Sequence, residues 1–190
     1  MYYIKLVFYV IINCGEIKMK LFRPNITYKS YKDVDLDFLL SKNIDTILID
    51  IDNTLAPHDE SLPSKDAIEF INNVKEKNIN IFTISNNNEE RVNTFSKGLN
   101  VKGYSFSLKP LKKTYKKVLK ENPNLGNICV IGDQLLTDIL GGNRMKFMTI
   151  YTRPLVQKDI TFTKFNRFFE RFIINRLEKK NLLNLGEYYE

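Results

Sequence analysis

The stretch TILIDIDNTLAPHD, residues 46–59, decides how the rest of the chain is interpreted. Its apolar beginning predicts a buried strand, and the carboxylates of Asp50 and Asp52 follow directly, spaced one residue apart. Placing carboxylates at the end of a buried strand costs free energy unless cations or hydrogen bonds compensate them. We therefore expect a compensating partner, and a functional reason, for this acidic pair.

Apolar runs bounded by turn residues alternate with helix-like segments along the chain. Each helix-like segment is long enough to cross over a sheet, a pattern typical of βαβ units. The expected strands are 46–51, 79–84, 104–107, 128–131 and 148–151, and the expected helices are 64–77, 89–97, 111–121 and 135–141. The predicted fold class is α/β, a parallel sheet with helices on both faces.

Length and composition are those of one globular domain. The chain has 190 residues, of which 43% are apolar and 27% charged, which suits a single core and shows no bias toward disorder. Its net charge of +7 favours anionic partners such as phosphate esters, nucleic acid or acidic lipid. Cys14 and Cys129 form no CxxC pair, which favours a reducing cytoplasm.

The beginning of the chain, residues 1–18, differs in character from the remaining residues. Its apolar run from Leu6 to Ile12 falls short of the roughly 20 residues that span a bilayer. It also lacks the basic start and small-residue cleavage site of a secretory signal. We predict an extension of uncertain status over residues 1–18, either an added apolar segment or a core strand, and a single domain over residues 19–190.

Polar residues follow the expected carboxyl ends of the strands. In an open parallel sheet, the ligand crevice lies outside these ends. Taken strand by strand, the polar residues are Asp50 and Asp52, then Ser85 and Asn86, then Lys109, and then Asp133. We expect them to line one crevice.

Carboxylates in such a crevice suit phosphoryl transfer. A carboxylate can attack a phosphoryl group, but the two negative charges repel each other unless a cation lies between them. Mg²⁺ is a hard ion that prefers oxygen ligands, and Asp50 and Asp133 would supply the negative charge that holds it. Asp52 is placed to donate a proton to the leaving oxygen and later to take one from the attacking water.

Four short motifs carry a family resemblance: DIDNTL, TISNNN, LKP and GDQLLTDILGGN, in this order. They resemble the motifs of the haloacid-dehalogenase (HAD) superfamily, and the layout around residues 46–151 resembles its subfamily IIIA, YqeG-type phosphatases. Eukaryotic relatives of that type include mitochondrial phosphatidylglycerophosphate phosphatases. The resemblance implies a HAD-like Rossmannoid core, Mg²⁺ as cofactor and hydrolysis of a phosphomonoester through an aspartyl-phosphate intermediate.

Residue roles follow from the same resemblance. It implies that Asp50 is the nucleophile, Asp52 the acid/base and Lys109 the cation that steadies the transferring group. The expected substrate-binding residues are Ser85, Asn86 and Lys109. The expected metal ligands are Asp50, Asp52 and Asp133, with Asp138 as a supporting acid.

Plainer explanations of single motifs remain open. DIDNT could be a calcium loop, although such a loop needs glycine at its sixth position, where Leu55 stands. Ser85 could simply end a strand in a turn. Asp133 and Asp138 could be a turn residue and a helix-surface acid. His58, the only histidine, is expected at the surface of a flap after the first motif.

Lys109 begins a lysine-rich stretch, KPLKKTYKKVLK, in which any lysine could simply be solvated. Pro110 is expected as the first residue of a helix, where proline is well tolerated. Lys109 would then stand on the crevice side of the strand-to-helix turn, with Leu111 and Tyr115 facing the core.

The motif spacing leaves no room for a cap domain. Asp52 and Ser85 are 33 positions apart, and Ser85 and Lys109 are 24 apart. Members of the resembled superfamily insert their caps in these two intervals, so we expect a capless fold with an open crevice. An open crevice suits a phosphate on a large carrier such as a lipid, a protein or a nucleic acid end.

The C-terminal segment predicts an amphipathic basic helix over about residues 163–180. Seven basic and three acidic residues lie between Lys158 and Lys180. Such a helix could lie on an anionic membrane or pack its apolar face against the sheet, and both remain open. Its apolar positions, at helical spacing, are Phe165, Phe168, Phe169, Phe172, Ile173 and Leu177.

Three functions are compatible with these observations. The leading hypothesis is a Mg²⁺-dependent phosphomonoester hydrolase, for which the resemblance suggests phosphatidylglycerophosphate as substrate. The first alternative is a phosphatase for a soluble metabolite or a nucleic acid end, and the second is a non-enzymatic RNA- or ribosome-associated binding module. The predicted partner is a phosphorylated substrate, with nucleic acid disfavoured. The predicted location is the cytoplasm, with peripheral contact to an anionic membrane if the C-terminal helix binds lipid.

Overall fold

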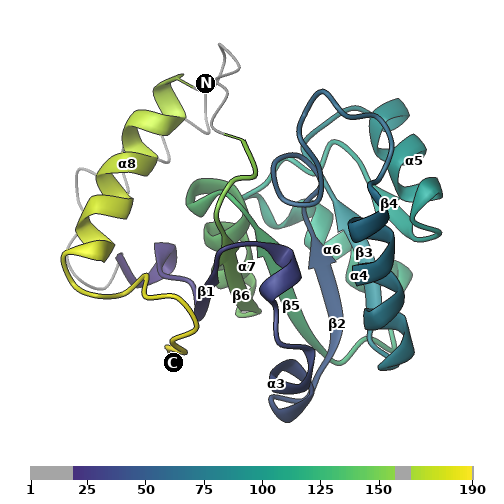
Figure 1. Ribbon diagram of the computed structural model, residues 1–190, viewed down its shortest axis with the longest axis horizontal. Coiled ribbons are helices and arrows are strands. Elements are labelled where there is room, and N and C mark those ends of the chain that lie inside the picture. The colour runs from purple at the N-terminus through teal and green to yellow at the C-terminus, as the bar shows by residue number, and fades with distance from the viewer. Residues whose placement is uncertain (1–18, 157–163, 190) are drawn as a thin grey trace.

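The structure, a computed structural model, describes residues 19–156 and 164–189. Its centre is a 6-stranded parallel sheet in the order β1-β6-β5-β2-β3-β4 (Figure 1). The strands are β1 (Ile26–Tyr28), β2 (Ile44–Ile49), β3 (Asn80–Ile84), β4 (Lys102–Tyr104), β5 (Asn127–Gly132) and β6 (Met148–Thr152). The extension predicted over residues 1–18 lies outside the described residues.

Helical segments connect the strands. Ser64 and Asn88 cap α4 and α5 by accepting hydrogen bonds from backbone N–H groups of the first turn. The α-helices are α3 (Leu36–Ser41), α4 (Lys65–Glu76), α5 (Glu89–Gly98), α6 (Lys112–Glu121), α7 (Leu140–Met145) and α8 (Lys164–Glu178). The shorter segments are the 3-10 turns η1 (Lys20–Phe22) and η2 (Tyr31–Asp33) and the π-helical turn η3 (Leu135–Ile139).

The helices cover both faces of the sheet, as predicted. Side chains of α3, α4 and α5 pack with Ile47 and Ile131 on one face. Side chains of α6 pack with Leu48 and Val130 on the other, where Met145 of α7 lies against the same cluster. Because successive residues of a strand point to opposite faces, the continuous apolar run of β2 supplies both cores.

The segment between β3 and α6 differs from the prediction. β4 ends at Tyr104 rather than extending over 104–107, because Phe106 (φ 44°) and Leu108 (φ 51°) adopt left-handed backbone conformations that a strand does not accommodate. Pro110 lies before α6, after a cis peptide bond, and Leu111 is the N-cap. Leu111, expected in the core, is therefore 38% exposed, whereas Tyr115 is buried.

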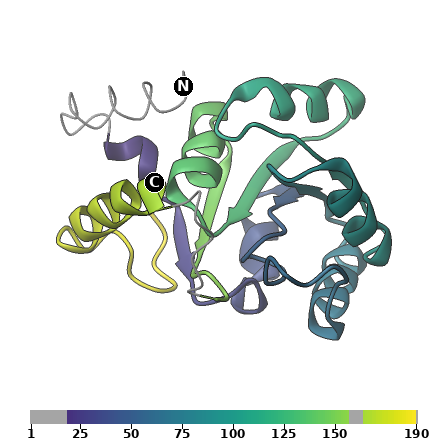
Figure 2. The same ribbon diagram turned by 90° about the horizontal axis from the view of Figure 1, so that it is seen from above.

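The C-terminal helix α8 lies at one end of the molecule, away from α4 and α5 (Figures 1 and 2). Ile173 and Leu177 are buried there in a separate apolar cluster with residues of η1, η3 and α7. Phe172 points outward and is 46% exposed. This half of the helix therefore packs against the domain through one face and leaves an aromatic ring at the surface.

No helix in residues 19–156 and 164–189 is long and apolar enough to cross a membrane. The two intervals in which a cap domain would be inserted are occupied by a loop with α4 and β3, and by α5 with β4. The carboxyl ends of the strands therefore carry no inserted domain, in agreement with the capless fold predicted.

Candidate active site

The carboxyl ends of four neighbouring strands supply the predicted site residues. Asp50 follows β2, and its backbone N–H donates to the carbonyl of Ile131 in β5 (2.9 Å). Asn53 takes a left-handed conformation (φ 64°) that turns the chain into the flap, defined here as residues 53–63. Asp50, Ser85, Lys109 and Asp133 are all buried at this edge of the sheet.

Lys109 connects the first and fourth motifs. Its Nζ lies 2.5 Å from Oδ1 of Asp50 and 2.6 Å from Oδ1 of Asp138, and it donates to the carbonyl of Ile84 (2.9 Å). The lysine side chain is only 3% exposed. Burial alone would lower the pKa of Lys109, but the carboxylates of Asp138 and Asp50 raise it above its ordinary value. The lysine is therefore held as an ammonium.

Negative charge exceeds positive charge around this lysine. Burial raises the pKa of Asp50 to about 7, although the Lys109 ammonium opposes that shift. Burial and the neighbouring Asp50 carboxylate also raise the pKa of Asp133 well above its ordinary value. Three buried carboxyl groups share one ammonium, so the site has the electrostatic character of a cation-binding site.

The carboxylates are also close enough to hold one ion. One oxygen of each of Asp50, Asp133 and Asp138 lies within 4.8 Å of the others. A buried set of oxygen donors fits a hard divalent cation. Thr54, the threonine of the DIDNT motif, donates to Oδ1 of Asp133 (3.4 Å) and orients that carboxylate. Asp52, also predicted as a metal ligand, adds no carboxylate oxygen to this cluster.

Asp52 instead points toward the second motif. Its Oδ2 accepts hydrogen bonds from Ser85 Oγ (3.2 Å) and Asn87 Nδ2 (3.3 Å). Its Oδ1 accepts from Arg91 Nε (2.9 Å) and lies 3.2 Å from His58 Nδ1. The predicted acid/base and the predicted phosphoryl-binding serine are therefore in direct contact. His58 is half exposed, as expected for the flap, but it also touches this carboxylate.

Asn86, predicted to bind substrate, braces the third motif. Its Oδ1 accepts from the backbone N–H of Lys109 (2.7 Å) and from Ser107 Oγ (2.8 Å). Its Nδ2 donates to the carbonyl of Lys109 (3.3 Å). Since both ends of the amide are occupied by this loop, the contacts of Asn86 hold Lys109 in place, and direct contact with substrate stays a prediction.

Arg91 at the start of α5 was missed by sequence reasoning. Besides Asp52, its guanidinium contacts the carbonyls of Pro57 (3.3 Å) and Glu60, so it ties the flap to the acid/base. Its position alone gave no signal, because a surface arginine in a helix is ordinary. Glu170 of α8 was also missed, and its Oε1 accepts from the backbone N–H of Leu135 (2.6 Å), within the fourth motif.

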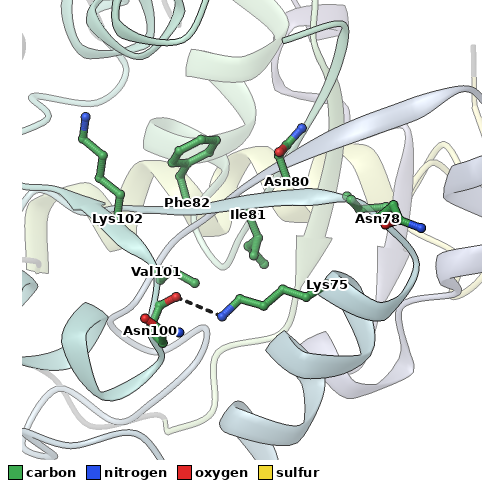
Figure 3. Close-up of a pocket in the computed structure, with 9 residues that line it drawn as sticks. Lys75, Asn78, Asn80, Ile81, Phe82, Asn100, Val101 and Lys102 are labelled. Carbon is green, nitrogen blue, oxygen red and sulfur yellow. Dashed lines mark hydrogen bonds between the residues drawn. The ribbon is translucent and has the colours of Figure 1, made fainter. Parts of the chain in front are cut away.

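A hollow of about 460 Å³ lies at the opposite edge of the sheet (Figure 3). It is lined by the amino ends of β3 and β4 and by the end of α4, including Lys75 and Asn78. Lys75 Nζ donates to the carbonyls of Leu99 (3.2 Å) and Asn100 (2.9 Å), and Figure 3 shows the second of these contacts. The hollow shares no residue with the acidic cluster of Asp50, Asp133 and Asp138.

Comparison with known families agrees with the site. Residues 12–157 match the family model described as mitochondrial PGP phosphatase. The chain belongs to this family. It is therefore a phosphatase of the HAD type, as the motifs predicted, and an enzyme.

Two curated proteins are similar over most of this chain. The protein described as probable phosphatase YqeG of Bacillus subtilis is 36% identical over 169 residues, covering 88% of this chain and 98% of the relative. Phosphatidylglycerophosphate phosphatase 1, chloroplastic/mitochondrial, of Arabidopsis thaliana is 25% identical over 149 residues, covering 73% of this chain and 43% of that protein. The chain thus spans less than half of the plant relative.

Similarity to a solved structure supports the assignment of the fold but not of the function. DsGPDH of Dunaliella salina superimposes with a TM-score of 0.50 at 14% identity, over 67% of this chain and 28% of that protein. A likeness at this identity shows that the chain shares a Rossmann-like α/β fold and says nothing about its substrate.

Proposed function

We propose that the chain is a Mg²⁺-dependent phosphomonoester hydrolase that acts through Asp50, with phosphatidylglycerophosphate as its substrate. The observation that carries the proposal is the buried cluster in which Asp50 contacts the Lys109 ammonium beside Asp133 and Asp138. Structural ion pairs are also buried in proteins, but this one lies where ligands bind in open α/β sheets.

The proposed reaction has two displacements. An oxygen of Asp50 attacks the phosphorus atom, and the bond between phosphorus and the substrate alcohol oxygen breaks as Asp52 gives that oxygen a proton. In the second displacement Asp52 takes a proton from water, the water oxygen attacks phosphorus, and the bond to Asp50 breaks. Inorganic phosphate leaves, and both carboxyl groups return to their first protonation state.

The remaining site residues would position the phosphoryl group. Ser85 contacts Asp52 and could donate to a phosphoryl oxygen between Asp52 and Asp50. Lys109 would compensate charge on the transferring group. The ligands of Mg²⁺ would be Asp50, Asp133 and Asp138, where the ion would neutralise the repulsion between the phosphate and the nucleophile.

A lipid substrate is supported by the family and by the absence of a cap in the two intervals of the described domain. The names of the family and of the plant relative state PGP as the substrate of those proteins. A soluble metabolite or nucleic acid end is the second candidate, because an open site also accepts small esters. Membrane contact through residues 163–180 is a further proposal, supported by the exposed Phe172 and Arg176.

A phosphate-release screen tests the proposal. Purified protein is offered lipid, sugar and nucleotide monophosphates, with Mg²⁺ and with EDTA. We expect phosphatidylglycerophosphate to be hydrolysed fastest and hydrolysis to stop in EDTA. A faster soluble substrate would replace the lipid assignment, and full activity in EDTA would contradict the metal assignment. Cell fractionation tests the predicted location. We expect the protein in the cytoplasmic fraction or in a membrane fraction from which high salt releases it, and recovery outside the cytoplasm would contradict the prediction.

A further inference from the structure

Large apolar side chains stand exposed around the mouth of the candidate site. Among the nine such residues in the described ranges, five lie in the loops after β2, β4 and β6, with exposures between 38% and 65%. The loop after β6 touches the flap, because Leu155 N–H donates to the carbonyl of Asn53 (3.0 Å). The five residues, here called the apolar rim, are Leu62, Phe106, Leu108, Leu111 and Leu155.

The loop between β4 and α6 has a backbone conformation that is unfavourable for two of the bulky residues it carries. Phe106 and Leu108 have φ values of 44° and 51°, in the left-handed region that bulky residues rarely adopt. Elsewhere in the described chain, left-handed positions are mostly occupied by asparagine, which tolerates them. Those positions are Asn43, Asn53, Asn78, Asn100 and Asn181.

Internal packing does not account for the two bulky residues. Phe106 is 59% exposed and Leu108 is 54% exposed, so neither side chain fills the core. The turn itself is needed to place Lys109, but asparagine at 106 and 108 would make the same turn at lower cost. The apolar character of these side chains therefore points to a contact outside the described domain.

The surroundings of the loop indicate the charge of that contact. Lys112 and Lys113 occupy the first turn of α6, where the helix dipole favours acidic residues, and that turn holds no acidic residue. Both lysines are exposed, as is Arg153 after β6. Apolar tips flanked by basic side chains are the surface that an anionic lipid bilayer complements.

We propose that the apolar rim inserts into the surface of an anionic bilayer and that the basic residues beside it contact lipid phosphates. The inference rests on the proposed phosphatase function, because it would bring a phosphorylated headgroup in the membrane surface to Asp50. Phe106 adjoins the site through Asn87, whose carbonyl accepts from the Phe106 N–H (2.9 Å) and whose side chain contacts Asp52. Docking and catalysis would share one edge of the sheet.

The test compares the double variant Phe106→Asn/Leu108→Asn with wild type. Asparagine suits the left-handed backbone, so the variant should fold and keep its activity on a small soluble phosphate ester. Binding is measured by co-sedimentation with vesicles of equal parts phosphatidylcholine and phosphatidylglycerol. We expect at least about tenfold weaker binding, because the variant has two fewer apolar side chains to bury in the bilayer. We also expect a matching loss of activity on phosphorylated lipid in those vesicles.

Matched controls separate the rim from other surfaces. Leu40→Gln alters an exposed apolar residue of α3, which precedes β2 at the opposite edge of the sheet, and should bind like wild type. Phe172→Gln tests α8, and a loss confined to that variant would overturn the rim proposal. Wild-type binding by the double variant, or no vesicle binding by wild type, would also overturn it. The proposal would also be overturned if wild type were a dimer and the double variant a monomer, because the rim would then be a dimer interface. Failure of the proposed function is distinct, since wild type would then release no phosphate from any ester.

Discussion

The two edges of the parallel sheet, formed by the amino ends and by the carboxyl ends of its strands, place different residue types at left-handed backbone positions. At the amino edge, the turns before β2, β3 and β4 place Asn43, Asn78 and Asn100 at left-handed positions, where asparagine is tolerated. At the carboxyl edge, bulky residues take such positions after β4, and buried carboxyl groups gather around Lys109. Local preferences that are obeyed at one edge are broken at the other, which is the pattern expected of a functional site.

The largest effect is expected from a comparison of two aspartates near opposite ends of β2, Asp45 in its amino end and Asp50 just after its carboxyl end. Asp50→Asn should abolish turnover, because the amide is not a nucleophile for phosphorus. Asp45→Asn changes an aspartate near the amino end of the same strand, which accepts from Gly126 N–H (3.1 Å), and should leave turnover nearly unchanged. Steady-state phosphate release from both purified variants is the measurement. Sustained turnover by Asp50→Asn, free of contaminating phosphatase, would disprove the nucleophile assignment.

A smaller effect is expected for the acid/base. Asp52→Asn keeps a side chain of similar shape beside Ser85 and Arg91 but cannot donate the proton to the leaving oxygen. We expect a loss of about 10²–10⁴ in rate for an alkyl phosphate. An aryl phosphate, whose leaving oxygen needs little protonation, should lose much less. Equal losses on the two esters would show that Asp52 acts in some other way.

The sequence predicted the parts of this contrast that depend on short-range patterns. Continuous apolar runs identified β2, β3, β5 and β6 within a few residues, because strands buried on both faces need apolar residues at every position. The motif order placed Asp50, Lys109 and Asp133 at one edge, since parallel strands align their carboxyl ends. The structure brings these residues together as the sequence indicated, while their catalytic roles stay predictions.

Features decided by distant contacts could not be predicted in this way. β1 has three residues, and its pairing with β6 joins segments more than a hundred positions apart, so no local pattern marks it. Arg91 is recognisable only when the flap carbonyls and Asp52 are seen around it. The early end of β4 depends on the turn that Asn86 braces from the neighbouring loop.

The stability of the metal-free protein should depend on pH because of the buried carboxyl groups at the carboxyl edge. In EDTA, folded Asp50 has a pKa of about 7, raised by burial from an ordinary value of 3.8. Between these values the folded state holds a proton that the unfolded chain has released, so stability falls as the pH rises. We expect the melting temperature in EDTA to drop by several degrees from about pH 5 to about pH 8.

Two controls sharpen that expectation. Asp50→Asn should reduce the pH dependence in EDTA, because the variant has no proton to lose at this position, and Asp133, whose pKa is also raised, should account for what remains. Mg²⁺ should stabilise wild type more at the higher pH, where the carboxylates are ionised. A melting temperature that is constant or rises with pH in EDTA would show that Asp50 is already ionised in the folded, metal-free protein.

The smallest effect tests the contrast between the edges directly, by exchanging their residues at left-handed positions. Leu108→Asn gives the carboxyl edge the residue that the amino edge uses, and Asn78→Leu makes the reverse change at another exposed left-handed position (φ 58°). A left-handed conformation costs a bulky residue about 1–2 kcal/mol, and asparagine retains part of that cost, so each exchange should change the stability by about 1 kcal/mol. Leu108→Asn should therefore raise the melting temperature by about 2–4 °C, and Asn78→Leu should lower it similarly. Thermal unfolding of both variants in the same buffer is the measurement. If Leu108→Asn melted lower than wild type, the leucine would stabilise the isolated fold, and its apolar side chain would need no partner outside the domain.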